Sequence, residues 1–518
     1  MSDIRSLVDT LIREQSFKNI LSYVIITTSG IYLIAYADPY IALFILPFFI
    51  IGSGRQRPLN VVLARAAVPA LVFITISALK FNITGVPLVT YDHHFIGDNI
   101  LLLAYNDWRV VLCLLTSIFA TGYYFYGFSC SRTRFSYNEK TAISGLGLIS
   151  IFCIWNILTW DQEIFNFNAE QNAPSIRGFI KSAQLPDPKM DTLLEAKEAP
   201  VIGEIALRAP VSGRPDLYFI LQESTFHPRL LSPNYEPKAL FSKTSDSTGP
   251  LHVHTYGGGT WKSEFSLAVQ MRPQEFGGDG MYVFYQLEGR VRRSIFTILK
   301  SLGYRTMVFY PVPGNFINAN KFYRSIGVDE FFDPQTLGIS AGWDWKIPDS
   351  AFYKAMEKKV GESNQPVVAF MLTINQHGPH EKGNALRDYI ARFNESDVAY
   401  SDFLNHLKRQ TRKSGVVAFG DHQPDFTEGI VDTAVMHTTN YDLRCINFEC
   451  SKSPMTDRVG KQIDIVLLGT LSLESFGFAL DGFSELQKTV FKKCKDNITL
   501  CDDISRRTIN SAFSSFFH

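Results

Sequence analysis

Charged residues are scarce in this sequence, and neither sign of charge prevails. Asp, Glu, Lys and Arg make up 19% of the 518 residues, whereas apolar types reach 46%. The 50 Lys and Arg residues balance 50 Asp and Glu residues, so the chain lacks the basic excess that nucleic-acid-binding proteins normally show. No internal repeat is evident. The shortage of charge is concentrated in the first third, which predicts a membrane part followed by a soluble part.

Residues 1–160 contain five apolar stretches. A spanning helix needs about 20 mostly apolar residues, and the second stretch is the shortest of the set. A pair of long buried helices in a soluble protein is the alternative, but five such runs favour a five-helix transmembrane domain. The stretches are Ile20–Ala37, Tyr40–Ile51, Val61–Leu79, Val110–Tyr126 and Ala142–Trp160.

The basic residues predict how this membrane domain is oriented. Clusters that include Arg13, Arg57 and Arg134 all fall on one side if the N-terminus is cytoplasmic. Positively charged short loops stay in the cytoplasm, and an odd number of spans then places everything after Trp160 outside it. The first apolar run follows a long polar segment, so we expect no cleavable signal peptide.

Residues 161–215 read as a link between two domains. Asp161–Ala183 predicts an amphipathic juxtamembrane helix that can lie on the membrane surface. Gln184–Pro215 then holds five prolines without a strong periodicity, which is typical of a linker.

Residues 216–518 show an α/β pattern. The alternation of short apolar runs with helical patterns predicts a mainly parallel sheet with helices on both faces. The predicted strands are Leu217–Leu221, Thr306–Tyr310, Val367–Ile374, Val416–Phe419 and Ile463–Leu468. The predicted helices are Ser263–Met271, Gly289–Leu302, Asp349–Lys359 and Ala385–Thr411.

Polar residues follow several of these strands, where the active sites of such sheets gather. Glu223 follows the first strand, and Asp421 and His422 follow the fourth. Two carboxylates and an imidazole suit a zinc or manganese ion. Thr260 comes after three glycines and before a helical pattern, where free amides favour an anion and a metal would make the hydroxyl nucleophilic.

Three histidines are candidates for contact with a phosphate. His377 and His380 lie after the third strand, and His437 lies farther along the chain. An imidazole can hold phosphate oxygens or protonate a leaving alcohol. Each motif alone is more often a turn, an N-cap or a loop, but their combination in this order favours a metal-dependent site.

The order Glu-Ser-Thr, Gly-Gly-Gly-Thr, Asn-Gln-His-Gly-Pro-His and Gly-Asp-His resembles the sulfatase and alkaline-phosphatase superfamily. It is most similar to the membrane branch of lipoteichoic acid synthases, phosphoglycerol transferases and phosphoethanolamine transferases. The resemblance covers nearly the whole chain, and its motifs are specific in residues 216–518. It implies an alkaline-phosphatase-like extracytoplasmic domain that follows a membrane domain in the chain.

The resemblance also implies roles for individual residues. Glu223, Thr260, Asp421 and His422 match the metal ligands, and Thr260 also matches the nucleophile. His377 matches the histidine that binds the substrate phosphate. The implied reaction moves a phospholipid headgroup through a phosphothreonine onto an envelope glycan or lipopolysaccharide acceptor and releases diacylglycerol.

Two features leave the headgroup open between phosphoethanolamine and phosphoglycerol. The Gly-Asp-His-Gln-Pro form looks like the glycerophosphate subgroup. However, lipoteichoic acid synthases hold glycerol phosphate with a tryptophan and an arginine, and the matching positions here are Ile317 and Ala319.

Four cysteines fall in the outer domain, an even number that suits an oxidising compartment. They allow three pairings, of which we predict the sequence-near pairs Cys445–Cys450 and Cys494–Cys501 over a thiol zinc site. Disulfides together with a membrane anchor predict a multi-pass protein of a bacterial inner membrane with its catalytic domain in the periplasm.

Two other functions remain as alternatives. A membrane-anchored phosphodiesterase or sulfatase-type hydrolase would use the same metal and nucleophile and pass the group to water. A non-catalytic member would only scaffold envelope assembly, but the presence of Glu223, Thr260, Asp421 and His422 together disfavours it.

Overall fold

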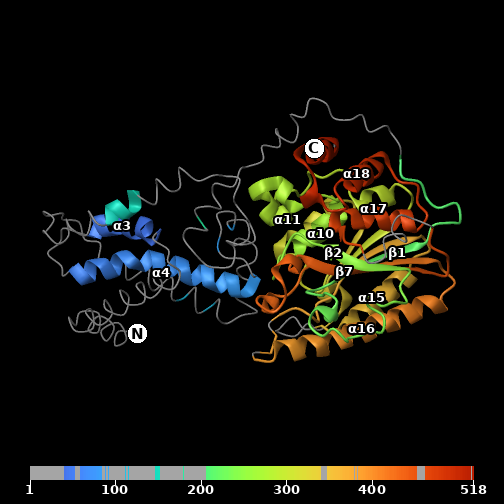
Figure 1. Ribbon diagram of the computed structural model, residues 1–518, viewed down its shortest axis with the longest axis horizontal. Coiled ribbons are helices and arrows are strands. Elements are labelled where there is room, and N and C mark those ends of the chain that lie inside the picture. The colour runs from blue at the N-terminus through green and yellow to red at the C-terminus, as the bar shows by residue number, and fades with distance from the viewer. Residues whose placement is uncertain are drawn as a thin grey trace. The chain divides into compact units, whose positions relative to one another are not determined.

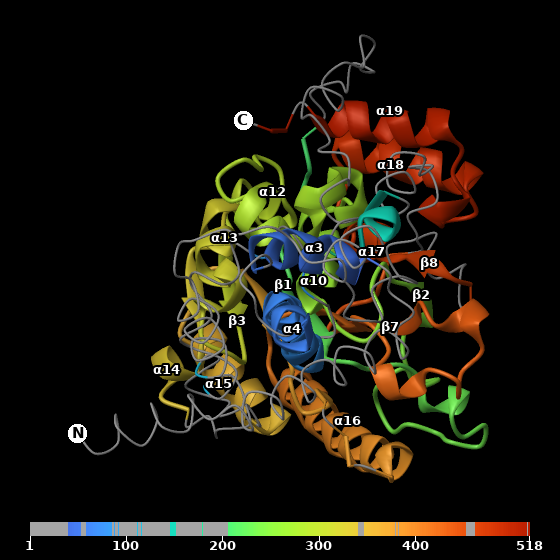
Figure 2. The ribbon, with the colours of Figure 1, turned by 90° about the vertical axis from the view of Figure 1, so that its left-hand side faces the viewer.

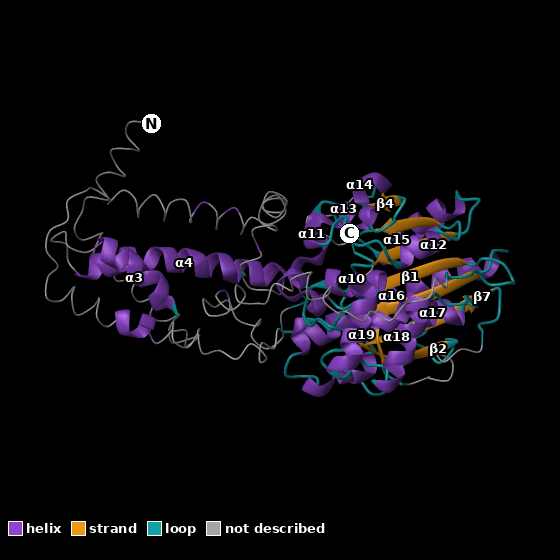
Figure 3. Cartoon of the chain, turned by 90° about the horizontal axis from the view of Figure 1, so that it is seen from above, coloured by secondary structure: helices purple, strands orange, loops and turns teal. Residues whose placement is uncertain are grey.

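The structure is a computed structural model that describes residues 40–52, 59–84, 146–151, a few single positions between 88 and 179, and then 206–339, 347–451 and 461–517 apart from positions 379, 382 and 515. These residues fall into two compact units. The first contains the described helices of the N-terminal part, and the second contains the described strands (Figure 3). The predicted link over residues 161–215 lies largely outside the described residues.

The first unit contains two apolar helices, α3 (Ile41–Gly52) and α4 (Leu59–Thr84). Small residues of α4 take part in the clusters between them, since Ala66 belongs to one buried cluster with Phe49 and Ala70 to another with Ile41. Small residues let two helices approach closely. Of the described helices, α4 alone is long and apolar enough to cross a membrane, over Val62–Lys80. The first predicted span and most of the fourth and fifth lie outside the described residues.

The second unit is built on an eight-stranded sheet with the order β4-β3-β5-β1-β6-β7-β2-β8. Among the described strands, β7 alone runs opposite to its neighbours, so the sheet is mixed but mainly parallel. The central strands β1, β5 and β6 are buried along their whole length, as expected for a sheet covered on both faces. The strands are β1 (Asp216–Gln222), β2 (Ser247–His252), β3 (Arg305–Phe309), β4 (Glu330–Phe332), β5 (Val367–Leu372), β6 (Ser414–Gly420), β7 (Thr438–Ile446) and β8 (Ile463–Asp464).

Helices cover both faces of this sheet. Figure 1 shows α15 and α16 on one face and α10 and α17 on the other, and α18 and α19 lie together in Figure 2. The α-helices are α10 (Thr260–Val269), α11 (Val283–Gln286), α12 (Ile295–Lys300), α13 (Ala319–Ser325), α14 (Pro334–Leu337), α15 (Asp349–Gly361), α16 (Ala385–Arg409), α17 (Ile465–Ser475), α18 (Gly482–Lys493) and α19 (Asp503–Ser514). Short 3-10 turns occur at Pro228–Leu230, Pro273–Tyr282, Phe316–Asn318, Asp425–Thr427, Thr433–Val435 and Ile498–Leu500.

Two of the predicted elements differ from the structure. The run Ile463–Leu468 was predicted as a strand, but the strand β8 ends at Asp464 and the buried helix α17 begins at Ile465. A short, mostly apolar run fits a buried helix as well as a strand. The Asp464 side chain within this run caps the helix by accepting from the amide of Val466. The helix predicted over Gly289–Leu302 is restricted to α12, which begins after the capping residue Ser294.

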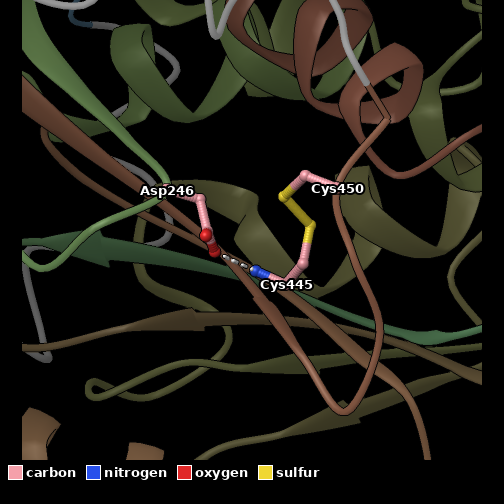
Figure 4. Close-up of side chains that lie close together, drawn as sticks. All are labelled: Asp246, Cys445 and Cys450. Atoms are coloured by element: carbon pink, nitrogen blue, oxygen red, sulfur yellow. Dashed lines mark hydrogen bonds between the residues drawn. A yellow bond between two sulfur atoms is a disulfide. The ribbon is translucent and has the colours of Figure 1, made fainter.

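The two predicted disulfides, Cys445–Cys450 and Cys494–Cys501, are confirmed. Figure 4 shows the first beside Asp246, whose carboxylate accepts a hydrogen bond from the amide of Cys445 at 2.8 Å. Asp246 and these two sulfurs lie within ligand distance of one another. Because the sulfurs are joined as a disulfide, they are not thiolates and do not offer a metal site.

Candidate active site

The site lies where the two central strands β1 and β6 end side by side. Their register pairs Gln222 with Gly420, so the next residues, Glu223 and Asp421, come together. Glu223 is 5% exposed and Asp421 is completely buried. Two carboxylates brought out of water at one point repel each other, and such a pair is stable only if a cation or a proton shares it.

The ends of β1 and β6 approach each other so closely that the backbone is specialised there. A Cβ added to Gly420 would lie 1.6 Å from the carbonyl oxygen of Thr225, a distance that excludes any side chain. Ser224 adopts a left-handed conformation with φ of 49°, which few non-glycine residues do. This turn directs the amide of Ser224 to the Oδ1 atom of Asp421 at 2.7 Å and thereby orients that carboxylate.

Thr260 is the first residue of α10 and lies beside the carboxylates. The preceding Gly259 has a φ of 78°, a left-handed conformation that lets the chain turn sharply into the helix. The Oγ1 atom of Thr260 donates to Glu223 Oε2 at 3.1 Å and lies 3.4 Å from His422 Nε2. The helix start is fixed to the β6 end, because the hydroxyl of Ser263 donates to the carbonyl of Asp421 at 2.6 Å.

The imidazole of His422 is oriented with its Nε2 atom toward the same point. Its Nδ1 atom lies 3.0 Å from the carbonyl oxygen of Gln423, which can only accept, so Nδ1 carries the hydrogen in the neutral ring. Nε2 then presents a lone pair at 3.2 Å from Asp421 Oδ2 and 3.6 Å from Glu223 Oε1. This arrangement, with one ring nitrogen bonded to a carbonyl and the other free to ligate, is typical of metal-binding histidines.

The donor set fits a divalent metal ion. Glu223, Asp421 and His422 each offer a ligand atom, and these atoms lie within 4.8 Å of one another. The Oδ2 atom of Asp421 is buried and accepts no hydrogen bond from any described residue. A bound cation would satisfy this oxygen and neutralise the paired carboxylates. Together with the hydroxyl of Thr260, the ligands are three oxygens and one nitrogen, a set that suits zinc or manganese.

The charges within the site shift the pKa of its members. Burial, followed by repulsion from Glu223, raises the pKa of Asp421 to about 7. Burial lowers the pKa of His422, but the attraction of Asp421 and Glu223 outweighs it and the pKa is raised. Binding of a metal ion here would favour the deprotonated forms of these groups.

His377 lies on the loop that follows β5. Its side chain is exposed, and its Nδ1 atom lies 2.7 Å from the carbonyl oxygen of Gly378. The loop is held from behind, because Arg392 donates to the carbonyl of His377 at 2.9 Å. Asp349 accepts from the amides of Ile374 and Asn375 at 3.3 and 3.2 Å. The structure therefore presents this imidazole on a fixed loop, without a hydrogen bond to the four grouped residues.

The other two candidate histidines lie in different surroundings. The side chain of His380 is 2% exposed, 3.3 Å from Asp388 Oδ2, with Phe426 packed edge-on to its ring. His437 immediately precedes β7, and its ring lies 6.3 Å from those of His252 and Tyr256. The structure brings Glu223, Thr260, Asp421 and His422 together and places His380 and His437 in other clusters.

One buried carboxylate near the site was missed in the sequence. Glu264 lies one helical turn after Thr260, and its carboxylate accepts from the hydroxyls of Tyr323 at 2.6 Å and Tyr310 at 3.3 Å. Burial raises the pKa of Glu264 to about 8, so it is largely neutral near pH 7. The spacing of four residues on one helix was the available signal, since it places both side chains on the same face.

Parts of this chain are similar to known proteins. Residues 215–458 match the family model described as Sulfatase. An uncharacterised protein of Haemophilus influenzae is 29% identical over 249 residues, which cover 42% of this chain and 45% of that protein. The lipoteichoic acid synthase-like protein YvgJ of Bacillus subtilis is 26% identical over 197 residues, covering 35% of this chain and 31% of that protein. The chain thus matches less than half the length of these curated relatives.

Among solved structures, the chain is similar to the Streptococcus pyogenes phosphoglycerol transferase GacH in complex with sn-glycerol-1-phosphate. The TM-score is 0.48 at 16% sequence identity, and the match covers 65% of this chain and 92% of that one.

Proposed function

We propose that this chain, whose residues 215–458 match the Sulfatase family model, is a member of the sulfatase and alkaline-phosphatase superfamily and a metal-dependent transferase that moves a substituted phosphate from a phospholipid to an envelope acceptor. The observation that carries the proposal is the position of Thr260. Its hydroxyl heads α10 and lies 3.1 Å from Glu223 Oε2 and 3.4 Å from His422 Nε2. A hydroxyl among metal-type ligands and at a helix N-terminus is suited to attack a phosphorus atom.

Glu223, Asp421, His422 and Thr260 would hold the metal ion. When bound, the ion supplies positive charge that favours the alkoxide form of Thr260 and neutralises phosphate oxygens. The Glu223 oxygen that accepts the hydrogen bond of Thr260 is the nearest acceptor for its proton. The free amides at the start of α10 stabilise the negative charge that develops on the phosphate.

The first half-reaction forms a bond between the Thr260 oxygen and phosphorus and breaks the bond between phosphorus and the diacylglycerol oxygen. The exposed imidazole of His377 is the proposed donor of the proton that diacylglycerol takes with it. In the second half-reaction, an acceptor hydroxyl attacks the phosphothreonine and its oxygen replaces that of Thr260. The proposed acceptors are an envelope glycan or lipopolysaccharide, reached from a multi-pass inner-membrane anchor.

The two headgroups proposed from sequence are phosphoethanolamine and phosphoglycerol. The side chains of Ile317 and Ala319 are 2% and 0% exposed and belong to the core. They offer no surface contact of the tryptophan and arginine type to a glycerol phosphate. The headgroup pocket must therefore be formed by other residues, and the donor assay below distinguishes the two lipids.

The test is release of diacylglycerol by purified full-length protein from phosphatidylethanolamine and, separately, from phosphatidylglycerol. We expect release from one lipid, lowered about 1,000-fold or more in Thr260→Ala because the nucleophile is gone. Unchanged release by Thr260→Ala would refute the nucleophile. Trapping of labelled headgroup on the wild-type protein before acceptor is added supports transfer, whereas immediate formation of free headgroup phosphate would indicate a hydrolase.

A further inference from the structure

A second group of metal-type ligands lies at the far edge of the sheet, apart from the residues of the active site. His252 ends β2, and its register partner in the parallel strand β8 is Asp464. Register partners in adjacent strands direct their side chains to the same face of a sheet. His254 lies two residues beyond the end of β2, and its ring contacts Asp464, so His252, His254 and Asp464 come together.

The distances within this cluster are short. His254 Nε2 lies 2.9 Å from Asp464 Oδ1, and the rings of His252 and His254 lie 5.1 Å apart and nearly perpendicular. One ligand atom from each of the three residues lies within 4.8 Å of the others. Ligands of a tetrahedral zinc ion stand about 3.4 Å apart, so a modest rotation of the imidazoles would complete the geometry.

A purely structural role accounts for only part of the cluster. Asp464 accepts from the amides of Val466 and Ile498, each at 3.2 Å, and thereby caps α17 and holds the following turn. The buried contact between His254 and the Asp464 carboxylate adds to that role. However, the ring of His252 makes no hydrogen bond to any other described residue, although only a small part of it is exposed. Burial followed by the nearby His254 lowers the pKa of His252 to about 4, which keeps its ring in the neutral form that binds metals.

We propose that His252, His254 and Asp464 form a second metal site, for an ion of the zinc class, that shares no ligand with the active site. The ion would join the end of β2 to the start of α17. The chain leaves β2 at His252 and reaches Thr260 eight residues later. The ion would therefore hold in place the end of the strand that leads to Thr260. Two imidazoles and one carboxylate leave a fourth position open for water.

The two sites should differ in the metals they prefer. The active site offers mainly oxygen ligands, which manganese accepts, whereas the second cluster offers two imidazoles, which favour zinc over manganese. When manganese alone is added to chelator-treated protein, the ion should occupy the active site before the second site. Zinc should fill both.

The test is the zinc content of full-length, detergent-purified protein, measured by mass spectrometry after chelation, zinc addition and dialysis. We expect about two ions per wild-type chain, about one in His252→Ala, about one in Asp421→Asn and about none in the double variant. His406→Ala is the matched control, since His406 is a partly exposed histidine of α16 outside both clusters, and it should keep two.

Thermal unfolding provides a second readout that does not depend on activity. Zinc should raise the unfolding temperature of Asp421→Asn, and it should not raise that of Asp421→Asn combined with His252→Ala. If His252→Ala does not fold, Asp464→Asn takes its place, because asparagine still caps α17 but ligates poorly. If His252→Ala and Asp464→Asn leave the zinc content unchanged, the proposal of a second site is wrong. If Asp421→Asn leaves the zinc content unchanged, the result counts against the catalytic metal instead.

Discussion

At the scale of single residues, the site depends on two backbones that nearly touch. Gly420 accepts no side chain because the carbonyl of Thr225 occupies the space that a Cβ would need. This contact brings Glu223 and Asp421 close enough to share one cation. The glycine of the Gly-Asp-His motif is thus required by packing as well as by chemistry.

We expect Gly420→Ala to destabilise the protein by about 3 kcal/mol or more, because the strand ends must separate to admit one methyl group. Separation would also move Asp421 away from Glu223 and weaken metal binding. Gly361→Ala is the matched control, since a Cβ there meets no atom within 4 Å. Thermal unfolding and metal content of both variants check the prediction, and equal stability of the two would contradict it.

The metal ligands allow a second test at this scale. Removal of the ion with a chelator should abolish turnover, and zinc or manganese should restore it, because Thr260 and the paired carboxylates need the positive charge. Glu223→Ala should bind the catalytic ion weakly and recover no activity on addition of metal. Full activity in the presence of excess chelator would contradict the metal-dependent mechanism.

At the scale of elements, α15 positions the loop that carries His377. Its first residue, Asp349, is buried and accepts hydrogen bonds from the hydroxyl of Ser396 and from the amides of Ile374 and Asn375. Burial raises the pKa of Asp349 to about 6, from 3.8 in the unfolded chain. The native state therefore favours the neutral carboxyl. Its contribution to stability is fully present below about pH 4 and is lost as the pH rises through 6.

We expect the wild-type protein to lose about 2 kcal/mol more free energy of unfolding between pH 4 and pH 7 than Asp349→Asn does. Asparagine keeps the shape of the side chain, and its amide can still bond Ser396, but it does not ionise. Denaturant unfolding of both proteins at the two pH values measures the difference. Parallel pH dependences would show that Asp349 does not titrate in this range.

At the scale of the whole molecule, the orientation in the membrane remains a prediction from the basic loops. We expect alkaline phosphatase fused after His518 to be active in a bacterial host and a green fluorescent protein at the same point to be dark, because only the phosphatase folds in the periplasm. Fusions after Arg134 should give the opposite result. Fluorescence from the fusion after His518 would place the catalytic unit in the cytoplasm and contradict the proposed lipid donor.

The sequence by itself determined which residues could perform the chemistry and which layer architecture would hold them. Continuous apolar runs such as Val416–Phe419 identified the buried strands, because a strand covered on both faces needs apolar side chains at successive positions. The spacing of the outer cysteines correctly predicted both disulfides, since short loops between cysteines close easily. The motifs at the strand ends named Glu223, Thr260, Asp421 and His422 as one group.

Only the tertiary structure decided what lies next to what. The order of the strands puts β1 beside β6, and this adjacency places Glu223 next to Asp421. The neighbouring Ser224 bonds Asp421 across a separation of 197 residues in the chain. Strands β2 and β7 carry few consecutive apolar residues, so their pairing and the convergence of His252 with Asp464 had no local signal. Local patterns follow from the preferences of neighbouring residues, whereas contacts across a sheet follow from packing that the whole chain must complete.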